Sequence, residues 1–377
     1  MKIEQRHWTE KDHWNSDLSK TDVKEAQLVL IFGSPSHIQN KTLFDEIRKS
    51  YPKAYILGGS TAGEICGTRV YENSLSVTAI FFEHTTLAST HSNICNEDSY
   101  TVGEKLIRTL SHEGLRHIFV LADGLNTHGT ELINGMSKHL PEGVSITGGL
   151  TADDGGFIET LVAANQFPKT RNIVALGFYG SRFKIGYGSG SGFAPFGPER
   201  VITRAKNNVL YELDGEPIFE LYKKYLGEKI KDFPTQCFHF PLWYKTRQMD
   251  EGIVRTILGF DEKAGSLTFA GDISIGSSAR LMKANIDNLV TGAEEAAKNC
   301  IPQKNEIPEL AILVSCVGRK IVMKQRVEEE IEIVHDVFSP ETTLAGFYSY
   351  GEIAPFGNLK SPHLHNQTMS ITTFSEN

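Results

Sequence analysis

The most constraining feature of the sequence is a repeated pattern: an apolar run, a helical stretch, a second apolar run and a glycine-rich turn. The first copy has apolar runs at residues 28–32 and 54–57, with a predicted helix over about 37–50 between them, and it ends in the turn 58–64. Continuous apolar runs are typical of strands that are buried on both faces. The pattern therefore predicts a βαβ unit, with two parallel strands joined by a crossover helix.

The same pattern recurs in the middle of the chain. Its apolar runs lie at 118–121 and 144–147, a helix is predicted over about 130–139, and the glycine turn is 148–153. In both copies thirty positions separate the first apolar residue from the double glycine. Equal spacing of like elements indicates an internal repeat of one structural unit.

A looser third copy lies near the C-terminus. Its apolar runs are at 310–314 and 343–345, and they are followed by glycine turns at 315–319 and 346–352. The three copies predict an α/β fold of repeated βαβ units in mixed sheets. In such sheets ligands bind beyond the carboxyl ends of the strands, where these turns lie.

Between the second and third copies, residues 172–193 predict long strands, and glycine occupies every second position from 186 to 192. The faces of a strand alternate with period two, so one face of this strand is bare backbone. We expect another strand, a helix or a flat ligand to lie close against that face, and tight packing is the favoured interpretation.

Composition excludes several classes of function. The 377 residues include 38 Lys plus Arg against 46 Asp plus Glu, for a net charge of −8, which argues against a nucleic-acid partner. No apolar run approaches the roughly 18 residues of a membrane span, and the polar N-terminus is unlike a signal peptide. Five scattered cysteines without a CxxC motif favour reduced thiols. We therefore expect a cytoplasmic protein that binds neither nucleic acid nor a membrane.

Ser60 lies in a turn that is similar to the nucleophile elbow of serine hydrolases, where the serine follows a strand on a tight turn. The second flanking position is Ala62 instead of glycine, and no partner histidine or aspartate is identified. The alternative is a glycine turn whose backbone N–H groups bind a ligand or cap a helix, and we favour it.

Two histidines and two charged residues are further candidates. His239 is embedded in aromatic residues, which is typical of a core histidine or of an axial ligand to a flat apolar cofactor. His365 forms an alternating pair with His363 before the final predicted strand. Arg319 and Glu352 lie in the C-terminal glycine turns, where each is half of a surface ion pair or binds a polar ligand, Arg319 as a fork for a carboxylate.

Four motifs in order resemble the FIST sensory domains. The segment 58–64 (GGSTAGE) is similar to the N-terminal FIST half, and the C-terminal half is matched by 315–319 (SCVGR), 346–355 (GFYSYGEIAP) and 364–368 (LHNQT). The resemblance covers nearly the whole chain after about residue 25. It implies an N-terminal segment over 1–25 and two related FIST-like domains over 26–205 and 206–377.

The resemblance implies a sensor of a small molecule instead of an enzyme, and a separate signalling partner such as a histidine kinase or a cyclase, since the FIST-like region reaches the end of the chain. A homodimer is compatible with this organisation. The motifs place the expected ligand-binding residues at Ser60, Thr61, Glu64, Arg319, Tyr348, Glu352 and Asn366.

Three functions stay open at this point. Free-standing FIST proteins include nitric-oxide-sensing haem proteins of the NosP type, which regulate a histidine kinase; haem b would then be the cofactor, with His239 as the iron ligand and His365 as second choice. The second function is a haem-free sensor of a small polar metabolite such as an amino acid. The third is a serine hydrolase that acts through Ser60.

Overall fold

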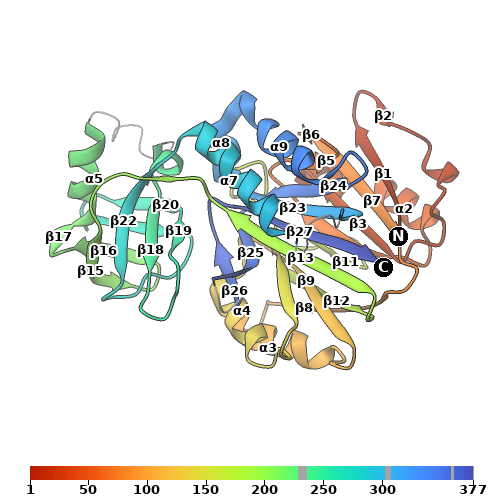
Figure 1. The fold of residues 1–377 in the computed structure, drawn as a ribbon, viewed down its shortest axis with the longest axis horizontal. Coiled ribbons are helices and arrows are strands. Elements are labelled where there is room, and N and C mark those ends of the chain that lie inside the picture. Colours follow the sequence, from red (N-terminus) through yellow and green to blue (C-terminus); the bar gives the residue numbers. More distant parts are fainter. Residues whose placement is uncertain (228–235, 302–306, 358–360, 377) are drawn as a thin grey trace.

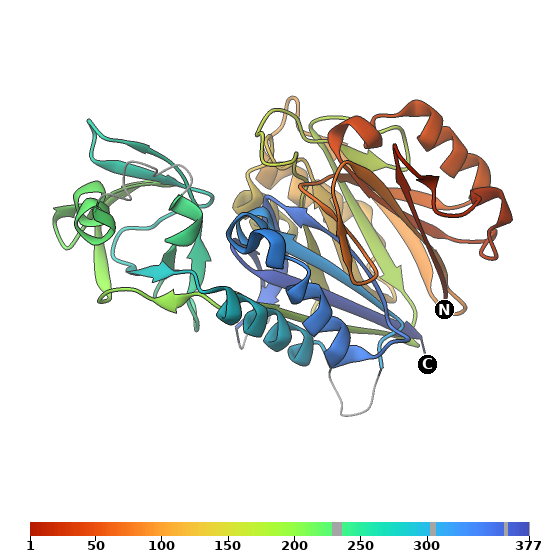
Figure 2. The ribbon, with the colours of Figure 1, turned by 90° about the horizontal axis from the view of Figure 1, so that it is seen from above.

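The computed structural model describes residues 1–227, 236–301, 307–357 and 361–376, and their strands form four sheets (Figure 1). Three six-stranded sheets make up one part, which we call the body. The fourth, nine-stranded sheet lies to one side and is formed by residues 194–283, which we call the insert. Figure 2 shows the insert as a separate lobe beside the body.

The first sheet has the order β11-β4-β3-β7-β1-β2. Its centre is the first sequence repeat, in which β3 and β4 pair in parallel and β7 pairs antiparallel with β3. The Asn40 side chain caps α2, and the helix buries Leu43, Phe44 and Ile47 against the sheet. The elements of this unit are β1 (Lys2–Thr9), β2 (His13–Trp14), η1 (Leu18–Lys20), β3 (Leu28–Gly33), α1 (Pro35–Ile38), α2 (Lys41–Ser50), β4 (Tyr55–Ser60), β5 (Glu64–Cys66), β6 (Arg69–Tyr71) and β7 (Ser74–Phe81).

The second sheet repeats this plan in the order β26-β25-β10-β9-β12-β8. The strands β9 and β10 are parallel, and β12 is antiparallel to β9. Asp98 caps α3, which packs against α4 on the outer face of the sheet. The elements of this unit are β8 (Thr86–Asn93), α3 (Ser99–Thr109), β9 (Leu115–Ala122), α4 (Gly129–Ser137), β10 (Ser145–Leu150), β11 (Val162–Ala164) and β12 (Asn172–Tyr179).

The third sheet has the order β13-β27-β23-β24-β5-β6, with β23 and β24 parallel and β27 antiparallel to β23. The looser third repeat of the sequence is therefore a full copy of the same unit. Its elements are β13 (Phe183–Gly190), α7 (Ile286–Asn299), β23 (Leu310–Cys316), α8 (Val317–Met323), η4 (Lys324–Arg326), α9 (Glu329–Phe338), β24 (Thr343–Ser349), β25 (Gly351–Phe356), β26 (Ser361–His365) and β27 (Met369–Glu376).

The three units exchange strands in a cycle. After its glycine turn, the first unit sends β5 to the third sheet, the second sends β11 to the first sheet, and the third sends β25 to the second sheet. Each foreign strand pairs antiparallel with the second parallel strand of its host sheet. The body is therefore one interlocked assembly of three like units.

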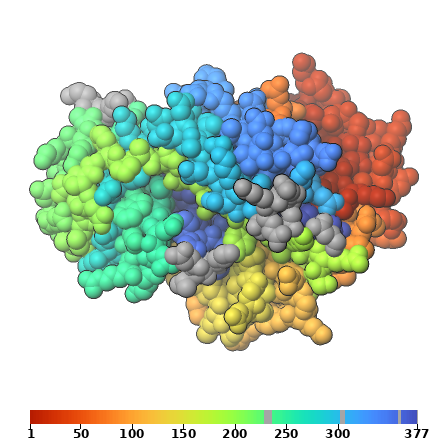
Figure 3. Space-filling model, in the orientation of Figure 1, coloured from red at the N-terminus to blue at the C-terminus, as the bar shows by residue number. Residues whose placement is uncertain are grey.

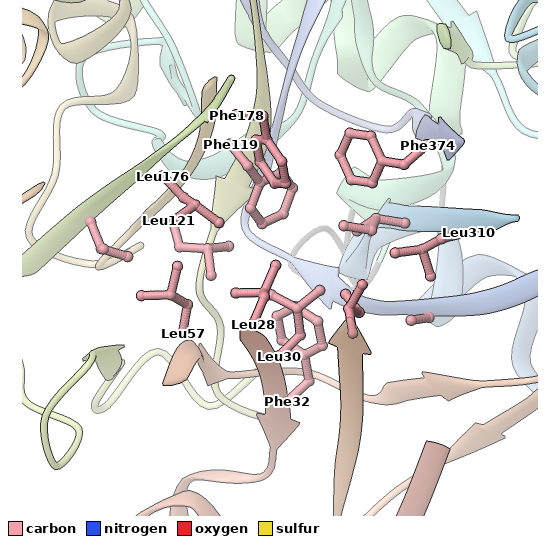
Figure 4. Packing of buried hydrophobic residues seen from close by; sticks show 14 of the residues in the cluster. Leu28, Leu30, Phe32, Leu57, Phe119, Leu121, Leu176, Phe178, Leu310 and Phe374 are labelled. Atoms are coloured by element: carbon pink, nitrogen blue, oxygen red, sulfur yellow. The ribbon is translucent and has the colours of Figure 1, made fainter. Parts of the chain in front are cut away.

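The inner faces of the three sheets share one apolar core (Figure 4). Phe32 from the first unit stacks on Phe347 from the third, with ring centroids 4.5 Å apart, and Phe178 from the second stacks on Phe374, at 5.1 Å. The outer faces are covered by helices, for example by α7 and α9 over the third sheet. Both faces of the central strands are thus buried, which is why their sequences are continuously apolar.

The bare face of β13 lies against α7, as the alternating glycines predict. A Cβ on Gly188 would lie 2.2 Å from the carbonyl oxygen of Ala296, and one on Gly190 would lie 2.0 Å from that of Gly292. Glycine is therefore required because the backbone of the helix rests directly on the backbone of the strand.

The insert interrupts the third unit between β13 and α7. Its sheet has the order β19-β18-β22-β15-β16-β21-β20, and β14 and β17 add to β22 and β16. Its own apolar core lies between this sheet and α5. The elements are β14 (Ala194–Pro195), β15 (Arg200–Lys206), β16 (Val209–Leu213), β17 (Glu216–Pro217), α5 (Ile218–Leu226), η3 (Cys237–His239), β18 (Leu242–Lys245), β19 (Ile253–Arg255), β20 (Ile257–Asp261), β21 (Ser266–Phe269) and β22 (Ser278–Lys283).

The predicted α/β class with βαβ units in mixed sheets is confirmed. The predicted N-terminal segment 1–25 contains β1, β2 and η1, of which β1 pairs with β7 of the first sheet. The predicted division at 205/206 lies within β15, and β13 from the first half of the chain completes the third sheet. The position of that division stays a prediction.

Candidate functional site

The glycine turns of the three units meet at one place and bond to one another in a ring. Three of these backbone hydrogen bonds close the ring: the N–H of Ala62 donates to the Tyr348 carbonyl (3.0 Å), that of Tyr350 to Leu150 (3.1 Å) and that of Ala152 to Ser60 (2.9 Å). The three turns therefore lie together at one end of the body's sheets.

The first turn buries all three of its predicted ligand-binding residues. Ser60, Thr61 and Glu64 have no exposed surface. The Ser60 Oγ accepts from the backbone N–H of Leu161 at 2.9 Å, and the described residues place no histidine or lysine side chain in hydrogen bond with it. Thr61 and Ser74 both donate hydroxyl hydrogen bonds of 2.5 Å to the Glu64 carboxyl, and burial raises the pKa of that carboxyl to about 8.

Glu352 occupies the equivalent place in the third turn. It accepts hydroxyl hydrogen bonds from Ser349 at 2.8 Å and from Thr368 at 2.7 Å, and burial raises its pKa to about 8. Glu64 and Glu352 therefore have matching partners: a hydroxyl three residues earlier, and a hydroxyl at or just before the start of the antiparallel strand. The surface ion pair that was one alternative for Glu352 is wrong, because the side chain is fully buried.

Arg319 is also fully buried, so the alternative of a surface ion pair is wrong for it as well. Its Nε and Nη2 donate to Glu330 at 2.9 and 2.7 Å, and its remaining terminal nitrogen donates to the backbone carbonyl of Ser191 at 2.6 Å. Tyr348 donates to the same Glu330 carboxyl at 2.7 Å. The guanidinium is therefore occupied by the protein, and its use as a fork for a ligand stays a prediction.

The other three predicted residues make none of these ring hydrogen bonds, although His365 lies opposite Glu352 in the pairing of β26 with β25. Asn366 is 1% exposed, and its Oδ1 has no hydrogen-bond partner among the described residues. His365 is buried in β26, with its Nε2 3.3 Å from the Ala354 carbonyl, and burial lowers its pKa to about 3. His239 is half-buried in η3, where its carbonyl accepts from the backbone N–H of Ala284 at 2.9 Å.

A cavity of about 320 Å³ lies where the insert faces the second and third units of the body. Its volume falls at the lower end of the roughly 300–1,000 Å³ found for small-ligand sites. Figure 3 shows the insert as a lobe against the body. The lining residues come from both parts: Asn208, Phe238, Thr256, Leu258 and 269–271 from the insert, and 124–125, 127–130, Leu150, Phe157, Cys316, Val317, Tyr350 and Leu364 from the body.

The cavity walls are mainly apolar and aromatic, with a few polar groups. Phe157 stacks on Tyr350 with ring centroids 4.5 Å apart, and the Tyr350 hydroxyl bonds to the Asp153 carboxyl that organises this loop. The hydroxyls of Thr127, Thr130 and Thr256 are buried without a partner among the described residues. This is the composition of a site that encloses a small amphipathic molecule.

His128 and Asp272 form a charged contact across the edge of the cavity. His128 caps the N-terminus of α4 in the body, and its Nε2 lies 3.5 Å from Oδ1 of Asp272 in the insert. The hydrogen bond with Asp272 raises the pKa of His128 and lowers that of Asp272. Both groups are partly exposed, so the contact is a weak one that joins the two parts of the molecule.

None of the nine predicted site residues, all within the described part of the chain, lines this cavity. One signal in the sequence pointed there: Asp123 and Gly124 directly follow β9, at the carboxyl end of a parallel strand, where ligand sites are expected. The insert residues carry no motif, and their place opposite this loop depends on the tertiary fold.

The two predicted haem ligands, His239 and His365, both lie outside the cavity lining. Phe238, next to His239, lines the cavity, but the lining residues include neither His239 nor His365, and the volume is small for a porphyrin. The described residues contain no cluster of three or more His, Cys, Asp or Glu placed to hold a metal ion. Haem coordination by His239 or His365 stays a prediction. Among the helices of the described residues, none is long and apolar enough to cross a membrane.

Comparison with known proteins adds a family match. The FIST N domain model matches residues 27–216, and the FIST C domain model matches residues 219–355. The uncharacterized protein MJ1623 of Methanocaldococcus jannaschii is 25% identical over 340 residues, which are 83% of this chain and 65% of that protein. Among solved structures, a cyanuric acid hydrolase from A. caulinodans gives a TM-score of 0.36 at 8% identity, over 100% of this chain and 98% of that one.

Proposed function

Because this chain belongs to the FIST family, whose domains are signalling sensor domains, we propose that it senses a small molecule that binds in the cavity between the insert and the body. The observation that carries the proposal is that the cavity draws its walls from both parts. A ligand that contacts both parts favours the arrangement in which they enclose it, and this is how binding can change the surface that a partner reads.

The lining groups favour a haem-free ligand with an apolar body and a polar end. Phe157, Tyr350, Phe238 and Phe269 supply flat apolar surface, whereas the threonine hydroxyls supply hydrogen-bonding groups. This combination fits a small metabolite better than a large macrocycle, since the cavity is about 320 Å³.

The test is a thermal-shift screen of small metabolites with two matched variants. Ala270→Phe fills the cavity from the insert, and Ala264→Phe places the same side chain on an exposed turn of the same sheet. A ligand of the cavity should raise the Tm of the native protein and of Ala264→Phe but not of Ala270→Phe. A ligand that stabilises all three equally binds elsewhere, and the proposed site is then wrong.

Haem is a second candidate ligand, favoured by one observation: Phe238, in the aromatic segment around His239, forms part of the cavity wall. Bound haem would supply an iron centre for nitric oxide. The test is haem titration of the apoprotein, followed by the same titration of His239→Ala and His365→Ala. A Soret band and unit stoichiometry that the His239 variant alone lacks would support haem; a native protein that gains no Soret band would exclude it.

We propose that the signal passes to a separate histidine kinase or cyclase, in keeping with the sensory role of the family. Capture of partners from native lysate, with and without the ligand identified in the screen, tests this step. A kinase or cyclase whose activity changes only when ligand is present supports it. A partner enzyme whose activity is the same with and without ligand contradicts it.

A further inference from the structure

Arg255 is a buried cation whose charge has no close carboxylate among the described residues. It ends β19 in the insert, is 4% exposed, and donates from Nη1 to the carbonyl of Leu364 in the body at 2.9 Å. Its Nε has no hydrogen-bond partner among the described residues. This contrasts with Arg319, the other fully buried arginine, whose charge is met by Glu330.

The surroundings of Arg255 do not neutralise it. Asp272 lies close enough to raise the pKa of Arg255, but no carboxylate oxygen of the described residues lies within ion-pair distance of the guanidinium, and Asp272 itself contacts His128. Tyr244, His363 and His365 complete the titratable neighbours. Burial lowers the pKa of Arg255 to about 10, which reflects the cost of a buried charge without a counterion.

Arg255 lies directly behind the cavity wall. Thr256, the next residue in the chain, lines the cavity. Leu364, whose carbonyl accepts the hydrogen bond from Arg255, also lines it. Gly271 also lines the cavity, and a Cβ there would come within 2.8 Å of the Arg255 Nε and 2.9 Å of its Cζ. The guanidinium therefore packs directly on the backbone of Gly271, a residue of the cavity wall.

We infer that Arg255 is the anion-recognising residue of this cavity and that the ligand carries a carboxylate, placed against the wall formed by Gly271 and Thr256. This inference rests on the proposed function, because it specifies the ligand of the same cavity. The buried Thr256 hydroxyl, which has no partner among the described residues, is a second donor on that wall. Together with the Arg255 Nε, which also has no partner among the described residues, this hydroxyl supplies donors of the kind that bind a carboxylate.

The experiment compares two probes of equal size and different charge, 3-phenylpropionate and 3-phenylpropionamide, by titration calorimetry. The native protein should bind the carboxylate at least about tenfold more tightly than the amide, since hydrogen bonds to a buried charge are strong. Arg255→Met should abolish this preference, and Arg255→Lys should retain part of it. Arg204→Met, on the exposed side of the insert, is the matched control and should keep the full preference.

Gly271→Ala guards against misfolding of the arginine variants, because it keeps Arg255 in the chain while its Cβ, 2.8 Å from the Nε, forces the guanidinium to shift. It should also lose the preference. Equal binding of both probes by the native protein, or an unchanged preference in folded Arg255→Met, overturns the inference. If neither probe binds, the inferred ligand class is wrong. The proposed function still stands in that case if the thermal-shift screen finds a ligand whose binding is prevented by Ala270→Phe.

Discussion

The body and the insert are built on different plans, and the difference explains where the cavity lies. The body uses one unit three times, and its glycine turns close into a ring of backbone hydrogen bonds. Polar side chains of that ring, such as Glu64 and Glu352, are bonded to neighbouring hydroxyls. The insert has its own strand order, exposes Leu258 and Ile275, and holds in Arg255 a charge with no close counterion in the part of the chain that the structure describes. The repeated units close on one another, whereas the cavity lies where the insert that interrupts the third unit meets the body.

The largest change in stability is expected when the counterion of Arg319 in the body is removed. Glu330→Gln leaves the guanidinium charged and fully buried, so the free energy of unfolding should fall by about 3–5 kcal/mol. Urea denaturation followed by circular dichroism measures it. Glu329→Gln is the matched control, since the adjacent glutamate pairs with Arg326 on the surface, and it should leave stability nearly unchanged. Equal effects of the two variants would show that the buried pair does not hold the body together.

The second test uses the equivalent carboxyls of the ring. Glu64 and Glu352 have their pKa raised by burial from 4.5 to about 8, so the folded state binds their protons more tightly than the unfolded state. Their stabilising contribution is therefore fully present below about pH 4.5 and is lost as pH rises through about 8. Relative to Glu64→Gln or Glu352→Gln, the free energy of unfolding of the native protein should fall by on the order of a few kcal/mol across that window.

Unfolding free energies at steps of pH measure this loss, with Glu25→Gln as a control at an exposed carboxyl that pairs with Lys53. If the difference between native and Gln variants does not change with pH, the two carboxyls are not protonated in the fold. If the pH dependence appears for only one of them, the two turns are not equivalent, contrary to what their matching hydrogen bonds indicate.

The third test compares one glycine from each part. Gly190→Ala places a Cβ 2.0 Å from the carbonyl oxygen of Gly292 in α7, and this overpacking should cost about 1–3 kcal/mol. Gly259 in β20 has no atom within 4 Å of the added Cβ, so Gly259→Ala should be neutral or stabilise by up to about 1 kcal/mol. The midpoints of thermal unfolding report both. If Gly190→Ala leaves the midpoint unchanged, α7 does not rest on β13 as described, and a large cost of Gly259→Ala would mean that the space around Gly259 is not open.

Much of the body could be predicted from the sequence because its signals are local and repeated. The apolar runs 28–32, 118–121 and 310–314 lie within β3, β9 and β23, and the alternating glycines indicated a close neighbour. The exchange of β5, β11 and β25 between units could not be predicted, because strand partners far apart in the sequence leave no local pattern.

The site was harder to predict because the residues of the recognised motifs do not line the cavity. The residues in the recognised motifs, such as Ser60 and Arg319, are glycine-turn neighbours that the fold buries for its own hydrogen bonds. Arg255 lies in a strand without a recognised motif, and it is distinguished by burial with no close counterion among the described residues. Burial is a property of the tertiary fold, so no spacing in the sequence could have selected this arginine over the others.

The smallest test breaks the contact that joins the two parts, between His128 of the body and Asp272 of the insert. Asp272 raises the pKa of His128, so the histidine's contribution is fully present below about pH 6.5 and is lost as pH rises through the raised pKa. The lowered pKa of Asp272 makes its contribution present above about 3.8 and lost as pH falls. The contact is therefore strongest between about pH 4 and 6.5.

A double-mutant cycle of His128→Gln and Asp272→Asn measures the coupling energy between the two side chains. It should be below about 1 kcal/mol near pH 6, because both groups are partly exposed, and absent near pH 9. A coupling that persists unchanged to high pH would show that the two parts are joined here by packing and not by charge.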